Sequence, residues 1–171
     1  MRGYVQVYTG NGKGKTTAAI GLAVRAAGAG MKTYIGQFIK MGDYSEIKAL
    51  SRYADWITVE QFGKGRFVEG KPIPEDIDLA RIGLQKVRKV LASRAYQIVI
   101  LEEANVAVKF GLLAVGDLEE LITSKPTEVE LVITGRFAHH RIIALADLVT
   151  EMKAIKHYYH KGVESRVGIE S

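Results

Sequence analysis

The stretch that decides the fold reads Gly10-Asn11-Gly12-Lys13-Gly14-Lys15-Thr16-Thr17. An alternating, β-rich segment at residues 4–8 precedes it, and an alanine-rich helical pattern at 16–29 follows it. Glycines let backbone N–H groups converge on an anion where side chains would clash, and a helix N-terminus adds a favourable dipole. Strand, glycine-rich loop and helix in this order predict a P-loop, a cradle for the phosphates of a nucleotide.

The loop departs from the usual G-x-x-x-x-G-K-[ST] pattern, because Thr9 stands where the first glycine is expected and Gly10 comes one residue later. Lys15 is predicted to reach the outer phosphates, and Thr16 to place its hydroxyl on Mg²⁺. A glycine- and lysine-rich turn without a ligand is the alternative, but the flanking strand and helix favour a nucleotide. The predicted nucleotide contacts in this segment are Thr9, Gly10, Asn11, Gly12, Lys13, Gly14, Lys15, Thr16 and Thr17.

The amino-acid composition limits which classes of protein this chain can belong to. The 171 residues are 47% hydrophobic and 25% charged, which predicts one globular domain over 1–171 with a core of ordinary size. The absence of cysteine excludes disulfides, thiolate metal sites and cysteine catalysis. Without a signal-type or membrane-spanning apolar stretch, we expect a soluble, cytoplasmic protein with no membrane partner.

Strand and helix patterns alternate along the chain. Further strands are expected at 33–39, 57–59, 97–101, 129–134 and 148–152, and further helices at 45–51, 75–91, 117–123 and 140–146. A glycine-rich segment at 62–74 is a candidate lid or substrate loop, and a basic tail starts at Lys153. This alternation predicts an α/β fold of the P-loop NTPase (RecA-like) type: a three-layer α/β/α arrangement around a mostly parallel sheet of five or six strands.

Ligands bind beyond the carboxyl ends of parallel strands, and polar residues follow several predicted strands here. Glu102 and Glu103 come directly after an apolar strand, where a carboxylate can complete a Mg²⁺ shell; two surface glutamates are the alternative. Arg136 can bind a phosphate or form a salt bridge, and Gln37 and Lys40 are candidate substrate contacts. The four histidines lack zinc-ligand spacing.

The formal net charge of +5 is modest and spread along the chain, as on an ordinary mixed surface. A basic module that binds nucleic acid remains an alternative, although stacked aromatics and a recognisable motif are missing, so no nucleic-acid partner is expected. The loop by itself also permits a conventional ATPase or a small-molecule kinase.

Taken together, the sequence resembles the P-loop ATP:corrinoid adenosyltransferases over nearly its whole length. The resemblance rests on the loop from Thr9 to Ala19, on Gln37-Phe38-Ile39-Lys40, on Glu102-Glu103-Ala104-Asn105 with Gly111-Leu112-Leu113, on Thr134-Gly135-Arg136, on Ala146 to Met152, and on tail residues Lys156-His157, Gly162, Arg166 and Gly168-Ile169-Glu170. Thr9 is normal in that family.

The resemblance implies that a Co(I) corrinoid attacks the ribose C5′ of ATP and that triphosphate leaves, in cobalamin biosynthesis or salvage. It implies that ATP lies in the loop in the reverse of the usual sense. Lys15, Glu103 and Arg136 would be catalytic, and Thr16 and Glu103 would hold Mg²⁺ or Mn²⁺. It also implies an electron donor for Co(II) and a homodimer.

Two positions depart from the family pattern. Asp-Glu is usual after the apolar strand, whereas this chain has Glu102-Glu103, so the metal role is carried to Glu103 and not to Glu102. A Phe and a Trp usually face the corrin ring from the middle loop; here that loop has Phe67, and the single tryptophan is Trp56. Phe67 is therefore the expected corrinoid contact.

Overall fold

The computed structural model describes residues 2–64 and 72–170. Its centre is a sheet of six strands in the order β3-β2-β4-β5-β1-β6, and every neighbouring pair is parallel. The strands are β1 (Val5–Thr9), β2 (Thr33–Ile39), β3 (Ile57–Gly63), β4 (Ile98–Glu102), β5 (Glu130–Thr134) and β6 (Leu148–Glu151). The predicted parallel α/β class is confirmed.

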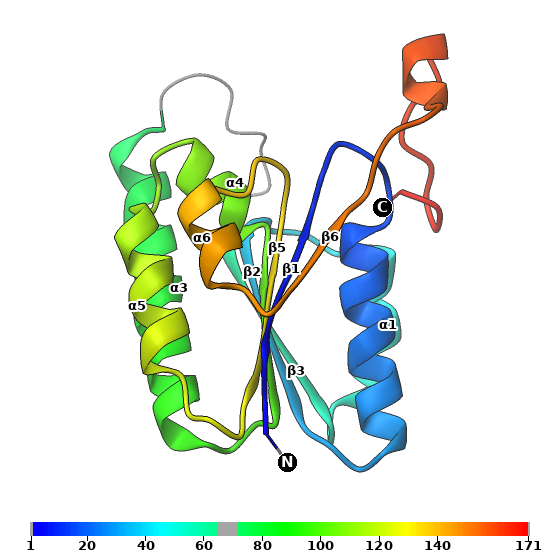
Figure 1. Ribbon diagram of the computed structural model, residues 1–171. Coiled ribbons are helices and arrows are strands. Elements are labelled where there is room, and N and C mark those ends of the chain that lie inside the picture. Colours follow the sequence, from blue (N-terminus) through cyan, green and yellow to red (C-terminus); the bar gives the residue numbers. More distant parts are fainter. Residues whose placement is uncertain (1, 65–71, 171) are drawn as a thin grey trace.

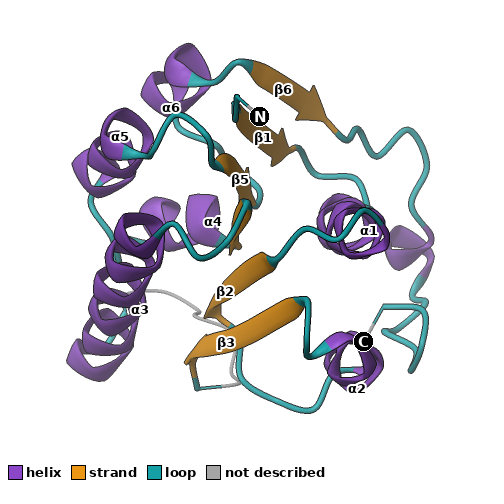
Figure 2. Cartoon of the chain, turned by 90° about the horizontal axis from the view of Figure 1, so that it is seen from below, coloured by secondary structure: helices purple, strands orange, loops and turns teal. Residues whose placement is uncertain are grey.

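Helices cover both faces of this sheet (Figures 1 and 2). On one face, α1 (Lys15–Gly28) and α2 (Ser45–Leu50) bury Ala19, Ala23 and Leu50 against Ile35 and Ile100. The other face carries α3 (Pro74–Ser93), α4 (Ala104–Lys109), α5 (Val115–Ser124) and α6 (His140–Leu145). Within the described residues, no helix is both long and apolar enough to cross a membrane.

The parallel register brings the polar strand ends to one edge of the sheet. Gln37 of β2 pairs with Glu102 of β4, and Tyr8 of β1 pairs with Thr134 of β5. Lys15, which begins α1, lies beyond the end of β1 at the same edge. The sheet therefore gathers residues from four separate segments around the glycine-rich loop.

Three local features differ from the sequence-based expectation. β3 continues to Gly63, beyond the predicted end at Val59, because it stays paired with β2 as far as Ile39. The short helix α4 was not predicted, since six residues give too little periodicity. The basic tail is not simply a tail: it contains a 3-10 turn (Tyr158–Lys161) and folds back toward the glycine-rich loop (Figure 1).

Candidate active site

The glycine-rich loop joins β1 to α1 through two glycines in left-handed conformations. Gly10 has a φ of 94° and Gly14 a φ of 123°, and residues with a side chain rarely adopt either. Gly14 directly precedes the first turn of α1, so the N–H groups of that turn start where the loop ends. The loop has the backbone that a phosphate cradle requires.

Lys15 is turned inward. It is only 7% exposed, and its Nζ donates hydrogen bonds of 2.7 Å to the carbonyl oxygens of both Gly10 and Gly12. Burial, followed by the nearby charge of Arg136, lowers the pKa of Lys15 below its ordinary value. The ammonium group is thus held inside the loop, close to where phosphates would lie.

A second charged group lies at the end of β4. The Glu102 side chain is 1% exposed; its Oε1 accepts a hydrogen bond from the Thr16 hydroxyl, and Lys40 Nζ lies 3.1 Å from its Oε2. Burial tends to lower the pKa of Lys40, but the charges of Glu102 and Glu103 outweigh this and raise it. We call Lys15, Lys40, Glu102 and Glu103 the inner cluster.

Glu103 lies in a left-handed conformation with a φ of 60°, at the residue before α4. For a residue with a side chain this conformation costs about 1–2 kcal/mol. Its backbone N–H donates a 3.1 Å hydrogen bond to Thr134 Oγ1, which ties the turn to the end of β5. Burial and the charge of Glu102 raise the pKa of Glu103, against the opposing effect of the neighbouring cations.

The two adjacent glutamates therefore differ in their contacts. The sequence favoured Glu103 over Glu102 beside Thr16, yet the Thr16 hydroxyl donates to Glu102. The reason is geometric: Glu102 is the last residue of β4, whereas the chain turns sharply at Glu103. The metal role predicted for Glu103 stays a prediction, and Glu102 joins it as a candidate.

The other predicted residues lie at the same edge in varied environments. Gln37 is buried and accepts a 3.0 Å hydrogen bond from Gln61 Nε2, and Thr9 Oγ1 accepts one of 3.2 Å from the Ala138 N–H. Asn11, Lys13, Thr17 and Arg136 are exposed. The predicted corrinoid contact Phe67 lies outside the described residues. Their ligand contacts stay predictions.

Asn105 lies at the same edge of the sheet, although no role was predicted for it. It is buried, its Nδ2 donates a 3.3 Å hydrogen bond to the Gly135 carbonyl oxygen, and its Oδ1 has no hydrogen-bond partner among the described residues. Such an orphaned polar atom is uncommon and points to a ligand or water partner. An asparagine two residues after a pair of acids at a strand end was the available signal.

The residues suit a magnesium ion better than a metal that needs a full protein cage. Among the described residues, no group of three or more His, Cys, Asp or Glu side chains could hold a metal. Mg²⁺ typically takes one or two carboxylates, with substrate phosphates and water completing its shell. Glu102 Oε2 is buried and lies 3.1 Å from Lys40 Nζ, so a Mg²⁺ ion at this carboxylate would share it with the lysine.

Comparisons with known proteins agree with the geometry. The chain matches the family of ATP:corrinoid adenosyltransferases BtuR/CobO/CobP over residues 1–171. A corrinoid adenosyltransferase of Pseudomonas aeruginosa is 34% identical over 170 residues, spanning 99% of this chain and 84% of the relative. One from Escherichia coli K12 is 32% identical, spanning 99% of this chain and 86% of the relative.

A solved structure shows the same fold at low identity. The crystal structure of a KaiC-like protein from Pyrococcus horikoshii superposes with a TM-score of 0.57 at 11% identity, covering 91% of this chain and 74% of that one. This likeness shows the fold alone. By the match over its full length and by its relatives, the chain belongs to the family of ATP:corrinoid adenosyltransferases, and it is a transferase.

Proposed function

We propose that this protein moves the 5′-deoxyadenosyl group of ATP to the cobalt of a reduced corrinoid, at the edge of the sheet where the inner cluster lies. The observation that carries the site assignment is the hydrogen bond between Thr16 and the buried Glu102, directly beside Lys15 in the loop. The family assignment favours this activity over a conventional ATPase or kinase.

During the reaction, negative charge builds up on the leaving group. Co(I) supplies the electron pair of the new cobalt–carbon bond, the C5′–O bond of ATP breaks, and triphosphate leaves with the bonding electrons. Lys15 and the loop amides would offset the negative charge that grows on the departing triphosphate, and the inward direction of Lys15 supports this role. Because Co(I) is itself strongly nucleophilic, none of the side chains has to act as a general base.

A divalent metal, Mg²⁺ or Mn²⁺, would be held by Thr16 together with Glu103 or Glu102. When bound, it would neutralise phosphate charge and so make triphosphate a better leaving group. Arg136 is exposed at the same edge, and its charge acts on both Lys15 and Glu103, which supports a phosphate-binding role. Gln37 and Lys40 remain candidate substrate contacts.

Further parts of the proposal rest on the family resemblance. They are a homodimeric state, a separate electron donor that reduces Co(II), and a cytoplasmic location. Phe67 stays the proposed corrinoid contact.

Incubation with ATP, Mg²⁺ and a chemically reduced corrinoid, without oxygen, tests this function. We expect a light-sensitive alkylcobalt spectrum and one equivalent of triphosphate for each cobalt alkylated. Release of ADP or orthophosphate without an alkylcobalt product would contradict the proposal and favour the conventional ATPase or kinase. Parallel reactions with a complete cobalamin and a precursor corrinoid would identify the preferred substrate.

A further inference from the structure

The C-terminal segment, residues 152–170, packs directly against the glycine-rich loop (Figure 1). The Gly12 N–H donates a 2.6 Å hydrogen bond to the Met152 carbonyl oxygen. A Cβ atom at Gly10 would clash with that oxygen, and one at Gly12 would lie 2.7 Å from it. Both glycines are thus required by the protein's own C-terminal segment, whatever a phosphate would require.

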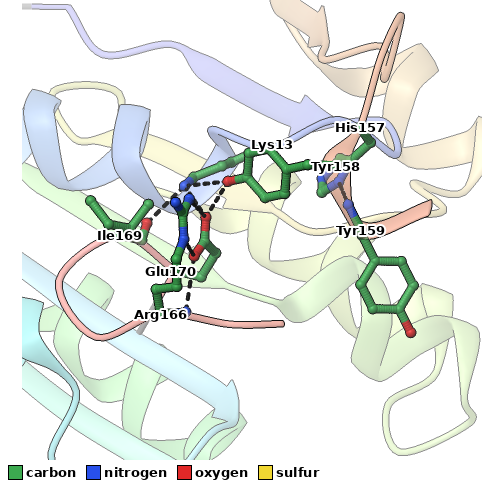
Figure 3. Close-up of polar contacts among 7 residues, drawn as sticks. All are labelled: Lys13, His157, Tyr158, Tyr159, Arg166, Ile169 and Glu170. Carbon is green, nitrogen blue, oxygen red and sulfur yellow. Dashed lines mark hydrogen bonds and ion pairs between the residues drawn. The ribbon is translucent and has the colours of Figure 1, made fainter. Parts of the chain in front are cut away.

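Lys13 makes a second connection between the loop and this segment (Figure 3). Its Nζ donates hydrogen bonds to Glu170 Oε1 at 2.8 Å, to the Ile169 carbonyl oxygen at 2.8 Å and to the Tyr158 hydroxyl at 3.2 Å. An ammonium group has three N–H donors, so these acceptors can use all of them. Lys13 therefore points to the C-terminal segment, whereas Lys15 points into the loop.

Glu170 is itself held in one orientation (Figure 3). Its carboxylate accepts hydrogen bonds from Arg166 through the backbone N–H at 3.0 Å, Nε at 3.2 Å and Nη2 at 3.1 Å, and one from the Tyr158 hydroxyl. The Arg166 guanidinium lies 5.0 Å from the centroid of the Tyr158 ring. We call Lys13, Tyr158, Arg166 and Glu170 the outer cluster.

This cluster contributes little to folding stability in water. The Lys13 and Arg166 side chains are 41% and 52% exposed, and ion pairs in such positions are screened by solvent. Its effect is instead to fix where one residue of the loop lies. Lys13 stands between Gly12 and Gly14, two residues with almost no conformational restraint of their own.

We infer that Glu170 is a positioning residue for the nucleotide loop: by binding Lys13, it holds the loop amides in the arrangement that the triphosphate of ATP needs. The inference deepens the proposed function and rests on it. A loop that is already ordered loses less conformational entropy when it binds a ligand, so the cluster strengthens ATP binding. Glu170 touches neither ATP nor the corrinoid in this role.

Calorimetric titration with Mg-ATP in the absence of corrinoid tests the inference. For Glu170→Gln we expect binding about fivefold weaker than wild type, the upper range for an exposed ion pair. Glu164→Gln is the matched control, since it removes the same charge from an exposed position of the same segment, and it should bind like wild type. In turnover, Glu170→Gln should raise the KM for ATP and leave kcat unchanged.

A double-mutant comparison separates positioning from a general charge effect. If Glu170 acts through Lys13, then Glu170→Gln should weaken ATP binding in the wild type but not in a Lys13→Gln background. An equal loss in both backgrounds, or wild-type affinity for Glu170→Gln, overturns the inference. If the wild type itself binds no Mg-ATP, the proposed function fails first. Unchanged melting temperatures would show that folding is not the cause.

Discussion

The two charged clusters on either side of the glycine-rich loop contain similar residues but differ in their exposure to solvent. In the inner cluster Glu102 is 1% exposed, and Lys40 and Thr16 are its partners. In the outer cluster Glu170 pairs with Lys13 and Arg166, both of which face water. The loop thus has one lysine, Lys15, buried on the side of the inner cluster and another, Lys13, exposed on the side of the outer cluster.

Burial changes what a charge can do. A buried charge that loses its partner is strongly destabilising, whereas an exposed pair contributes between almost nothing and about 1 kcal/mol. Electrostatic effects on a reacting bond are also largest where water is excluded. We therefore expect variants of the inner cluster to affect chemistry and stability, and variants of the outer cluster to affect only ATP affinity.

Lys15→Ala should have the largest effect. It removes the inward-facing ammonium that would balance the departing triphosphate, so kcat/KM should fall by about 100- to 1000-fold. Initial rates of alkylcobalt formation measure this. Lys89→Ala, at an exposed position of α3, is the control for loss of a lysine. Near-wild-type turnover of Lys15→Ala would contradict the catalytic role of Lys15.

Glu102→Gln tests which of the two adjacent glutamates binds the metal together with Thr16. The substitution keeps the shape of the side chain but removes its charge, so the metal loses a carboxylate ligand. We expect turnover to fall about tenfold or more, and the Mg²⁺ concentration needed for half-maximal turnover to rise. Magnesium titrations of the turnover rate give the measurement. If Glu103→Gln alone shows this behaviour, the metal role belongs to Glu103 as the sequence indicated.

Lys40→Met tests whether the inner cluster contributes more to folding stability than the outer cluster does. It leaves Glu102 buried without its cation, and unfolding in urea should show a loss of about 3 kcal/mol. Arg166→Met is the counterpart in the outer cluster and should unfold at the wild-type urea concentration, since its charge is exposed. Equal destabilisation by the two variants would show that burial does not distinguish the clusters.

Tyr158→Phe should have the smallest effect. It removes the hydroxyl that contacts Lys13 and Glu170 but keeps the ring beside Arg166, so ATP affinity should fall only about twofold. Tyr159→Phe, whose side chain is largely exposed, should leave it unchanged. A loss as large as that of Glu170→Gln would mean that the tyrosine, and not the carboxylate, fixes Lys13.

Local sequence patterns predicted most of the fold. The apolar run ending at Leu101 marked a buried strand, and the glycines and lysines after β1 marked the loop, because these signals depend on near neighbours in the chain. Helix α4 and the far end of β3 were missed, since one is short and the other is held in the sheet by pairing with β2.

By itself, the sequence determined the glycine-rich loop between strand and helix, the parallel α/β class and the family, because each depends on contiguous or regularly spaced residues. Only the tertiary structure decided that Glu102 contacts Thr16, and that Glu170 contacts Lys13 across 157 positions of the chain. The physical reason is that side-chain direction at a strand end depends on the exact residue where the strand stops. Contacts between distant segments depend on how the whole sheet brings them together.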